Sequence, residues 1–151
     1  MHAIRFAAVL AAATLATPAT AAVVGECTID ATAIAEPWST ESRTFANGAI
    51  RVAHLDTGGE PVCCPSHLMI LSPGGEPPED YRVCHMVSAR AEAPAGFLFV
   101  DVPGITSSYD PKLGLLLSVP TRTYENPNDG SYSEGSFAVR INQATGAVTL
   151  E

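Results

Sequence analysis

Short runs of alternating apolar and polar residues follow one another along the chain, and glycine, proline or asparagine closes most of them. Such runs are typical of half-buried β-strands, and the frequent prolines and glycines break helical windows. Only residues 31–40 leave room for a helical turn. The pattern therefore predicts an all-β fold, a small single-domain sandwich or barrel of roughly eight to ten short antiparallel strands.

Two hairpins are expected where paired runs flank a turn. Residues 42–46 and 49–55 flank Asn47-Gly48, and this dipeptide is typical of type I′ turns because both turn residues need a positive φ. Near the C-terminus, residues 136–141 and 147–150 flank a polar turn. The alternation in the first of these two runs predicts that Phe137, Val139 and Ile141 lie buried on one face. Further strands are expected at residues 97–102, 113–119 and 121–125, with the second of them ending at Pro120.

A third hairpin is expected from residues 62–71 and 81–89, which flank a loop rich in proline and glycine, residues 72–80. In a symmetric antiparallel register Leu71 faces Tyr81, and His67 then lies directly opposite His85. Facing side chains in a sheet are about 5 Å apart at Cβ. This register therefore predicts that the two imidazoles are neighbours.

The first 21 residues have the order of a secretory signal peptide. Residues 1–5 are basic, residues 6–15 are apolar, and Ala19-Thr20-Ala21 offers a small-x-small cleavage site. The apolar run is shorter than the roughly 20 residues that a spanning helix needs, and no later run is long enough. We expect residues 1–21 to be removed and residues 22–151 to form a single exported domain, periplasmic or secreted.

Four cysteines follow this segment: Cys27, Cys63, Cys64 and Cys84. An even number of cysteines in a small exported domain indicates a disulfide framework, and four cysteines allow three pairings. Adjacent cysteines rarely pair, because the small ring strains the peptide between them. We therefore expect two disulfides, with Cys27 bonded to one member of the doublet and Cys84 to the other.

The charge balance excludes some partners. The whole chain has a net charge of -8, and removal of Arg5 with the signal peptide makes the balance more negative. A negative surface repels nucleic acid and anionic lipid. The acidic residues are scattered, which is typical of a solvated surface.

The histidines and methionines are concentrated in one window. After residue 21, every His and Met lies between His54 and Met86, and the patterns His67-x-Met69 and Cys84-His85-Met86 stand out. Imidazole and thioether ligands together suit copper, and thioethers favour copper(I). With the symmetric register, His67, Met69 and His85 form a candidate copper site. The His-x-Met spacing resembles that of periplasmic copper(I)-carrying proteins over three residues, and the rest of that family's ligand spacing is not present.

Other chemistry is weakly marked. Residues 125–134 are rich in oxygen ligands, but their spacing differs from an EF-hand loop and fits a turn better. A zinc site needs free thiolates, which disulfides remove. Ser66 and His67 are adjacent, so on a strand they point apart and form no nucleophile–base pair. No Gly-x-Ser-x-Gly is present, and a non-enzymatic role is favoured.

The sequence thus favours a non-enzymatic binding or accessory module for a protein partner or surface, with no cofactor. Pro37-Trp38 and the loop from Tyr124 to Tyr132 are candidate contact segments, since loops on a rigid β scaffold often carry binding residues. A lone Trp in a β domain is nevertheless more often part of the core. The alternative from a different class is a periplasmic copper(I) carrier that uses the His/Met hairpin.

Overall fold

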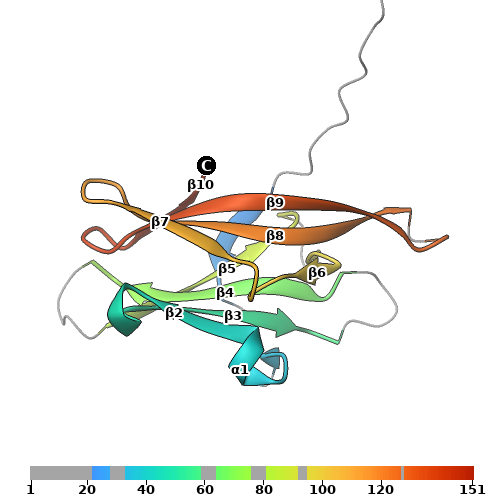
Figure 1. Cartoon of the computed structure of the whole chain (residues 1–151), viewed down its shortest axis with the longest axis horizontal. Helices are drawn as coiled ribbons and strands as arrows, with labels where there is room; N and C mark the ends of the chain where they lie inside the picture. The colour runs from blue at the N-terminus through green and yellow to red at the C-terminus, as the bar shows by residue number, and fades with distance from the viewer. Residues whose placement is uncertain (1–21, 28–32, 59–63, 76–80, 92–94, 127) are drawn as a thin grey trace, which may run out of the picture.

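A computed structural model of the chain describes residues 22–27, 33–58, 64–75, 81–91, 95–126 and 128–151. The described residues are mostly β, arranged as two antiparallel sheets that lie one above the other (Figure 1). The expected all-β class is confirmed, and the arrangement is the sandwich rather than the barrel. The expected signal peptide, residues 1–21, lies outside the described residues. No helix in the described part of the chain is long and apolar enough to cross a membrane.

The first sheet, called sheet A, has the strand order β1-β5-β4-β3-β2. Its strands are β1 (Val23–Glu26), β2 (Ser42–Phe45), β3 (Ile50–Asp56), β4 (Ser66–Pro73) and β5 (Arg82–Ser88). A single helical turn, α1 (Trp38–Glu41), precedes β2 and lies on the side of sheet A that faces away from the second sheet (Figure 1).

The second sheet, called sheet B, has the order β10-β9-β8-β6, and β7 also pairs with β8. Its strands are β6 (Phe99–Val100), β7 (Thr106–Asp110), β8 (Gly114–Asn126), β9 (Ser131–Asn142) and β10 (Ala147–Leu150). The far end of the β8–β9 hairpin extends beyond sheet A (Figure 1).

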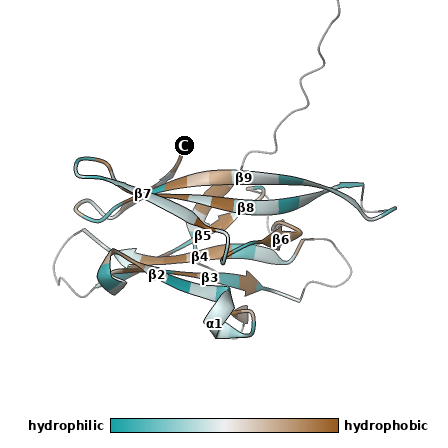
Figure 2. Ribbon diagram, viewed as in Figure 1, coloured by the Kyte–Doolittle hydropathy of each residue, from teal (hydrophilic) through white to brown (hydrophobic). Residues whose placement is uncertain are grey.

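The core fills the space between the sheets. Ile70 and Val87 from sheet A and Leu117 and Val139 from sheet B are all fully buried. Figure 2 shows the hydrophobic residues of β4 and β8 in the middle of the molecule, whereas the far end of the β8–β9 hairpin is hydrophilic. Where a strand alternates, as β9 does near its C-terminal end, the pattern decides which face turns inward.

The hairpin of β4 and β5 has a different register from the expected one. Leu71 faces Cys84 instead of Tyr81, and His85 faces Ile70. In the expected register Ile70 would face Arg82, which would place a guanidinium in the apolar core. The observed register avoids that cost and pairs Leu68 with Val87 on the core face, while Arg82 turns to the outer face.

The hairpin at Asn47-Gly48 is confirmed, but its turn is wider than a two-residue type I′ turn. Phe45 pairs with Ile50, so four residues connect the strands. Ala46, Asn47 and Gly48 have φ values of 51°, 55° and 86°. Positive φ is required here as expected, and the additional positive φ at Ala46 lengthens the connection.

The expected strand end at Pro120 is wrong. The strand β8 continues through Pro120, from Gly114 to Asn126. The carbonyl oxygen of Pro120 accepts a hydrogen bond from the Asp101 amide, on the side of β8 that faces β6 and β7. In an antiparallel ladder the nitrogen of the same residue points to that side too, and there β7 has ended and β6 begins. The missing N–H therefore removes no bond to β9.

The disulfide prediction is wrong in its pairing. Cys27 is bonded to Cys84, with a Cα–Cα distance of 5.5 Å. The reason is β1, which the sequence pattern did not reveal. It pairs with β5 and places Glu26 opposite His85, so the next residue of the chain meets Cys84. No described cysteine is a free thiol, and Cys63 lies outside the described residues.

The C-terminal hairpin forms as predicted, with Ala147 opposite Asn142. Val139 and Ile141 are fully buried. Phe137 is only partly buried, and its ring stacks on Phe97 with a centroid distance of 5.4 Å. The predicted inward face is therefore correct, but the end of β9 that carries Phe137 lies at the margin of the core.

Candidate functional site

A groove of about 330 Å³ crosses the outer face of sheet A beside α1. We call it the Trp38 groove. Two rows of side chains that run across β2, β3 and β4 form its floor: Ser42, Ala53 and Met69 in one row, and Thr44, Arg51 and Leu71 in the other. Ile34 and Trp38 also line it. Its volume lies at the lower end of the range for ligand pockets.

The shape of the groove follows from one small residue and one large residue. Ala53 sits on the central strand of the floor between Ser42 and Met69, where its short side chain is buried, and we call the space of the groove above it the hollow. Trp38, the only tryptophan of the chain, is 61% exposed on α1. The expectation that a lone Trp belongs to the core is therefore wrong, and its place as a candidate contact residue is retained.

Arg51 gives the groove a positive charge. It is exposed, and among the described residues its guanidinium makes no hydrogen bond, ion pair or cation–π contact. None of the described residues that line the groove carries a carboxylate. The second arginine of the lining, Arg43, is engaged elsewhere: its guanidinium donates hydrogen bonds to carbonyl groups of residues 102–105 at 2.6–3.3 Å.

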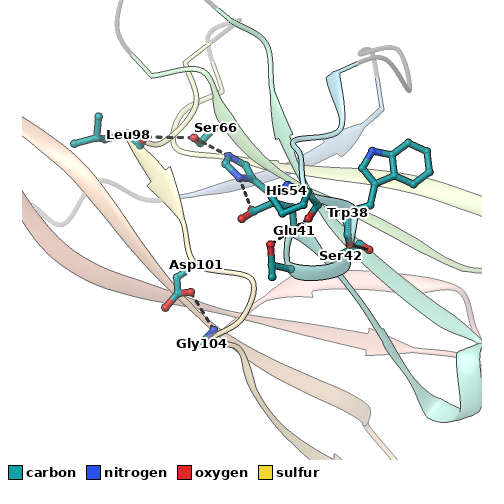
Figure 3. A network of polar contacts seen from close by, with 10 residues as sticks. Trp38, Glu41, Ser42, His54, Ser66, Leu98, Asp101 and Gly104 are labelled. Carbon is teal, nitrogen blue, oxygen red and sulfur yellow. Dashed lines mark hydrogen bonds and ion pairs between the residues drawn. The ribbon is translucent and has the colours of Figure 1, made fainter.

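A chain of polar contacts holds α1 against sheet A (Figure 3). Oε2 of Glu41 lies 2.9 Å from Nδ1 of His54, and Nε2 of His54 lies 2.9 Å from Oγ of Ser66. A carboxylate can only accept here, so Nδ1 donates. Oγ of Ser66 also lies 3.3 Å from the carbonyl oxygen of Leu98. In the figure the Trp38 ring points away from this network.

The order acid–histidine–serine is that of a catalytic triad, but the surroundings do not suit nucleophilic attack. Ser66 is only 3% exposed, because the segment that leads into β6 covers it. The amide of Ser66 donates a hydrogen bond to the carbonyl of Phe97, and the hydroxyl of Ser66 lies beside the carbonyl of Leu98. A substrate carbonyl needs open space at the hydroxyl oxygen. We therefore interpret the network as a support that ties the last residue of α1 to β3 and β4.

The structure does not bring the three predicted copper ligands together. His67 and Met69 share the outer face of sheet A, whereas His85 faces Ile70 and so points to the core side. The three-residue difference in register is the cause, because an odd shift moves a side chain to the opposite face. Met69 instead lies directly opposite Met86. The described residues contain no group of three or more His, Cys, Asp or Glu side chains that could hold a metal ion.

Burial disfavours the charged form of both histidines of the predicted site. Burial lowers the pKa of His67 below its ordinary value of 6.5, and the nearby His54 lowers it further. Burial also lowers the pKa of His85, while the carboxylate of Glu26 acts in the opposite direction. Nδ1 of His67 is 2.8 Å from Oγ of Ser88, and its Nε2 is buried with no hydrogen-bond partner among the described residues.

Tyr132, at the end of the second candidate contact segment, belongs to an aromatic–cation cluster on sheet B. The guanidinium of Arg122 lies 5.7 Å from the ring of Phe99 and 5.1 Å from the ring of Tyr132. Glu134 accepts hydrogen bonds from the same guanidinium at 3.2 and 3.3 Å. This cation is therefore already surrounded by partners within the chain.

The loop considered for calcium is a hairpin turn in its described part. Asp129 accepts hydrogen bonds from the Asn126 side chain and the Ser131 amide, both at 2.9 Å. Through these contacts the carboxylate organises the turn from within.

Sequence reasoning missed the groove floor and the polar network for the same reason. Ala53, Arg51 and Met69 meet only through strand pairing, and no local pattern marks them. The partner of Ser66 is His54 on the adjacent strand and not its sequence neighbour His67. The concentration of histidines in one window was the only signal that pointed to this part of the sheet.

No known protein family, no curated protein and no solved structure matches this chain.

Proposed function

We propose that the chain is an exported, non-enzymatic binding or accessory module for a protein partner, and that it binds through the Trp38 groove. Export rests on the order of residues 1–21 and agrees with the Cys27–Cys84 disulfide, because disulfides persist in oxidising compartments. The observation that carries the proposal is the exposed Trp38 side chain at the wall of a groove with an apolar floor.

Two physical arguments support this face over the rest of the surface. Tryptophan is enriched among the side chains that dominate binding energy in protein interfaces, and a large exposed ring beside a hollow leaves apolar area for a partner to cover. The polar network through Glu41 and His54 also fixes the position of α1, so the ring is presented by a supported turn. A supported contact residue loses less conformational entropy on binding.

Affinity capture from the exported protein fraction tests the proposal. We expect a partner, identified by mass spectrometry, to be retained by the wild-type domain and lost with Trp38→Ala. Tyr109→Ala is the matched control, since Tyr109 is 64% exposed on sheet B and should be dispensable. Equal retention by Trp38→Ala, or loss with Tyr109→Ala alone, would overturn the assignment to this groove.

The copper(I)-carrier alternative now has a different set of donors. His67, Met69 and Met86 share the outer face of sheet A, and Met69 faces Met86 directly, whereas His85 points away. If the chain carries copper(I), calorimetric titration should show binding that weakens with Met86→Leu and is unchanged with His85→Asn. Binding no tighter than micromolar in the wild type would leave the module without a metal function.

A further inference from the structure

We infer that the Trp38 groove recognises a polypeptide segment in which a large apolar side chain stands next to a carboxylate. This inference rests on the proposed function and adds the chemistry of the partner. The apolar side chain enters the hollow over Ala53, and the carboxylate meets the guanidinium of Arg51.

The hollow selects the apolar part of the ligand. Ala53 lies at its base, with Met69 and Leu71 on one side and the Trp38 ring at the wall. The side chains of Met69 and Leu71 are half-buried, so part of their apolar area still faces solvent. A leucine, methionine or phenylalanine side chain would cover that area and gain the stabilisation of apolar burial.

Arg51 selects the charged part of the ligand. Its guanidinium has no partner among the described residues, although the chain as a whole carries an excess of acidic residues. It stands in the same cross-strand row as Leu71, so a ligand that fills the hollow brings a neighbouring group to the arginine. A guanidinium pairs with a carboxylate through two parallel hydrogen bonds, which fixes the orientation of the ligand as well as its charge.

The surrounding charge distinguishes a polypeptide from a polyanion. None of the outward-facing positions of β1 to β5 is acidic, which makes this face the part of sheet A that least repels a carboxylate. A nucleic acid or an anionic membrane would need many cations at once, and the net charge of -8 opposes both. One arginine beside one hollow matches two adjacent side chains of a peptide.

Selection from a library of random heptapeptides displayed on phage tests the inference. We expect the wild-type domain to enrich sequences with Asp or Glu within two positions of Leu, Met or Phe. The enrichment should disappear with Ala53→Leu, which fills the hollow, and with Trp38→Ala, an exposed change that leaves the fold intact. Enrichment of sequences without an acidic residue, or no enrichment at all, would overturn the inference.

Calorimetric titration of one enriched peptide then isolates the role of Arg51. Replacing the acidic residue of the peptide by its amide should weaken binding to the wild type about tenfold or more, as expected for the loss of a charge-assisted hydrogen-bonded pair. With Arg51→Gln the two peptides should bind equally, and with the control Arg122→Gln on sheet B the preference should persist. A preference that survives Arg51→Gln would contradict the assignment.

The small molecule 4-methylpentanoate, which joins a carboxylate to a leucine-like body, distinguishes a peptide from a free acid. We expect it to bind at least tenfold more weakly than the enriched peptide, and equal affinity would overturn the polypeptide assignment. Failure of these titrations is distinguishable from failure of the proposed function. Capture of a partner that depends on Trp38 but not on Arg51 would retain the module and reject only the acidic recognition.

Discussion

The arginine beside the groove on sheet A and the arginines on the outer face of sheet B differ in their partners. On sheet B, Arg122 is paired with Glu134 at 3.2 Å, and Arg140 is paired with Glu151 at 2.7 Å through a two-pronged contact. On sheet A, Arg51 stands beside an apolar groove and makes no ion pair among the described residues. Arg51 and Arg122 are both exposed, and the difference between them is whether the chain supplies a carboxylate partner.

This comparison teaches where a partner can bind. An arginine that is already paired with a carboxylate of its own chain must give up that pair before it can bind a carboxylate of a partner. The lost pair offsets most of the binding free energy that the new pair supplies. A free guanidinium next to apolar surface offers both charge and area without such an exchange. We therefore expect the groove face of sheet A, the open face, to bind a partner more readily than the outer face of sheet B, where the arginines already have partners.

Of the changes considered, removal of the disulfide should have the largest effect on the free energy of unfolding. It ties β1 to β5 at the opposite edge of sheet A from the groove, between cysteines 57 residues apart. Replacing Cys27 and Cys84 by alanine should lower the free energy of unfolding by about 4 kcal/mol, because the unfolded chain gains the entropy of an open loop. Urea unfolding of the oxidised and variant proteins measures it. A loss below about 1 kcal/mol would mean that β1 contributes little to sheet A.

Replacement of Arg43 should have the next largest effect on the free energy of unfolding, because this arginine joins the two sheets. Its guanidinium donates to the carbonyls of Val102, Pro103 and Ile105. Arg43→Met should cost about 1.5–3 kcal/mol, since the carbonyls lose a charged donor. Arg51→Met is the control and should change the unfolding free energy by less than about 0.5 kcal/mol. Equal losses in the two variants would erase the distinction between an engaged and a free arginine.

Replacement of the paired Arg122 and of the unpaired Arg51 should also change the free energy of unfolding differently, by a smaller amount. Arg122→Gln should cost about 0.2–1 kcal/mol at low salt, and the cost should shrink in 1 M sodium chloride as the pair with Glu134 is screened. Arg51→Gln should show neither a cost nor a salt dependence. A salt-dependent loss with Arg51→Gln would reveal a carboxylate partner and contradict the open face.

Two histidines give the stability of the domain a dependence on pH in the mildly acidic range. Because burial lowers the pKa of His67 and His85, the unfolded chain binds their protons more readily than the folded chain. The stability from the neutral rings is complete above about pH 6.5 and decreases as the pH falls below that value. Unfolding midpoints between pH 7 and 5 should show this slope, and His67→Gln should reduce it to the part that His85 contributes. An unchanged slope in the variant would place the titration elsewhere.

The sequence predicted the parts of the fold that depend on local alternation. The first strand of the last hairpin alternates clearly, so Val139 and Ile141 were placed on an inward face by sequence alone. Strands without such alternation were missed: β1 is too short, and β7, from Thr106 to Asp110, is almost entirely polar and exposed at the edge of its sheet.

Register and long-range pairing were beyond local patterns. The offset between β4 and β5 depends on keeping Arg82 out of the core, and that requires knowledge of which face sheet B covers. The pairing of Cys27 with Cys84 depends on the same placement. The candidate site inherits this limit, because Ala53 and Arg51 acquire their roles only when β2 and β4 flank them, although Trp38 was recognisable as a contact candidate.

Amide hydrogen exchange of the domain, free and bound to its captured partner, tests the central claim most directly. The account predicts slower exchange on binding in α1, β2 and β3, which together span Trp38 to Asp56 and surround the groove. Exchange in the far end of the β8–β9 hairpin should be unchanged, since its arginine is already paired. Protection that falls on that hairpin while α1 and β2 exchange as before would show that sheet B is the binding face.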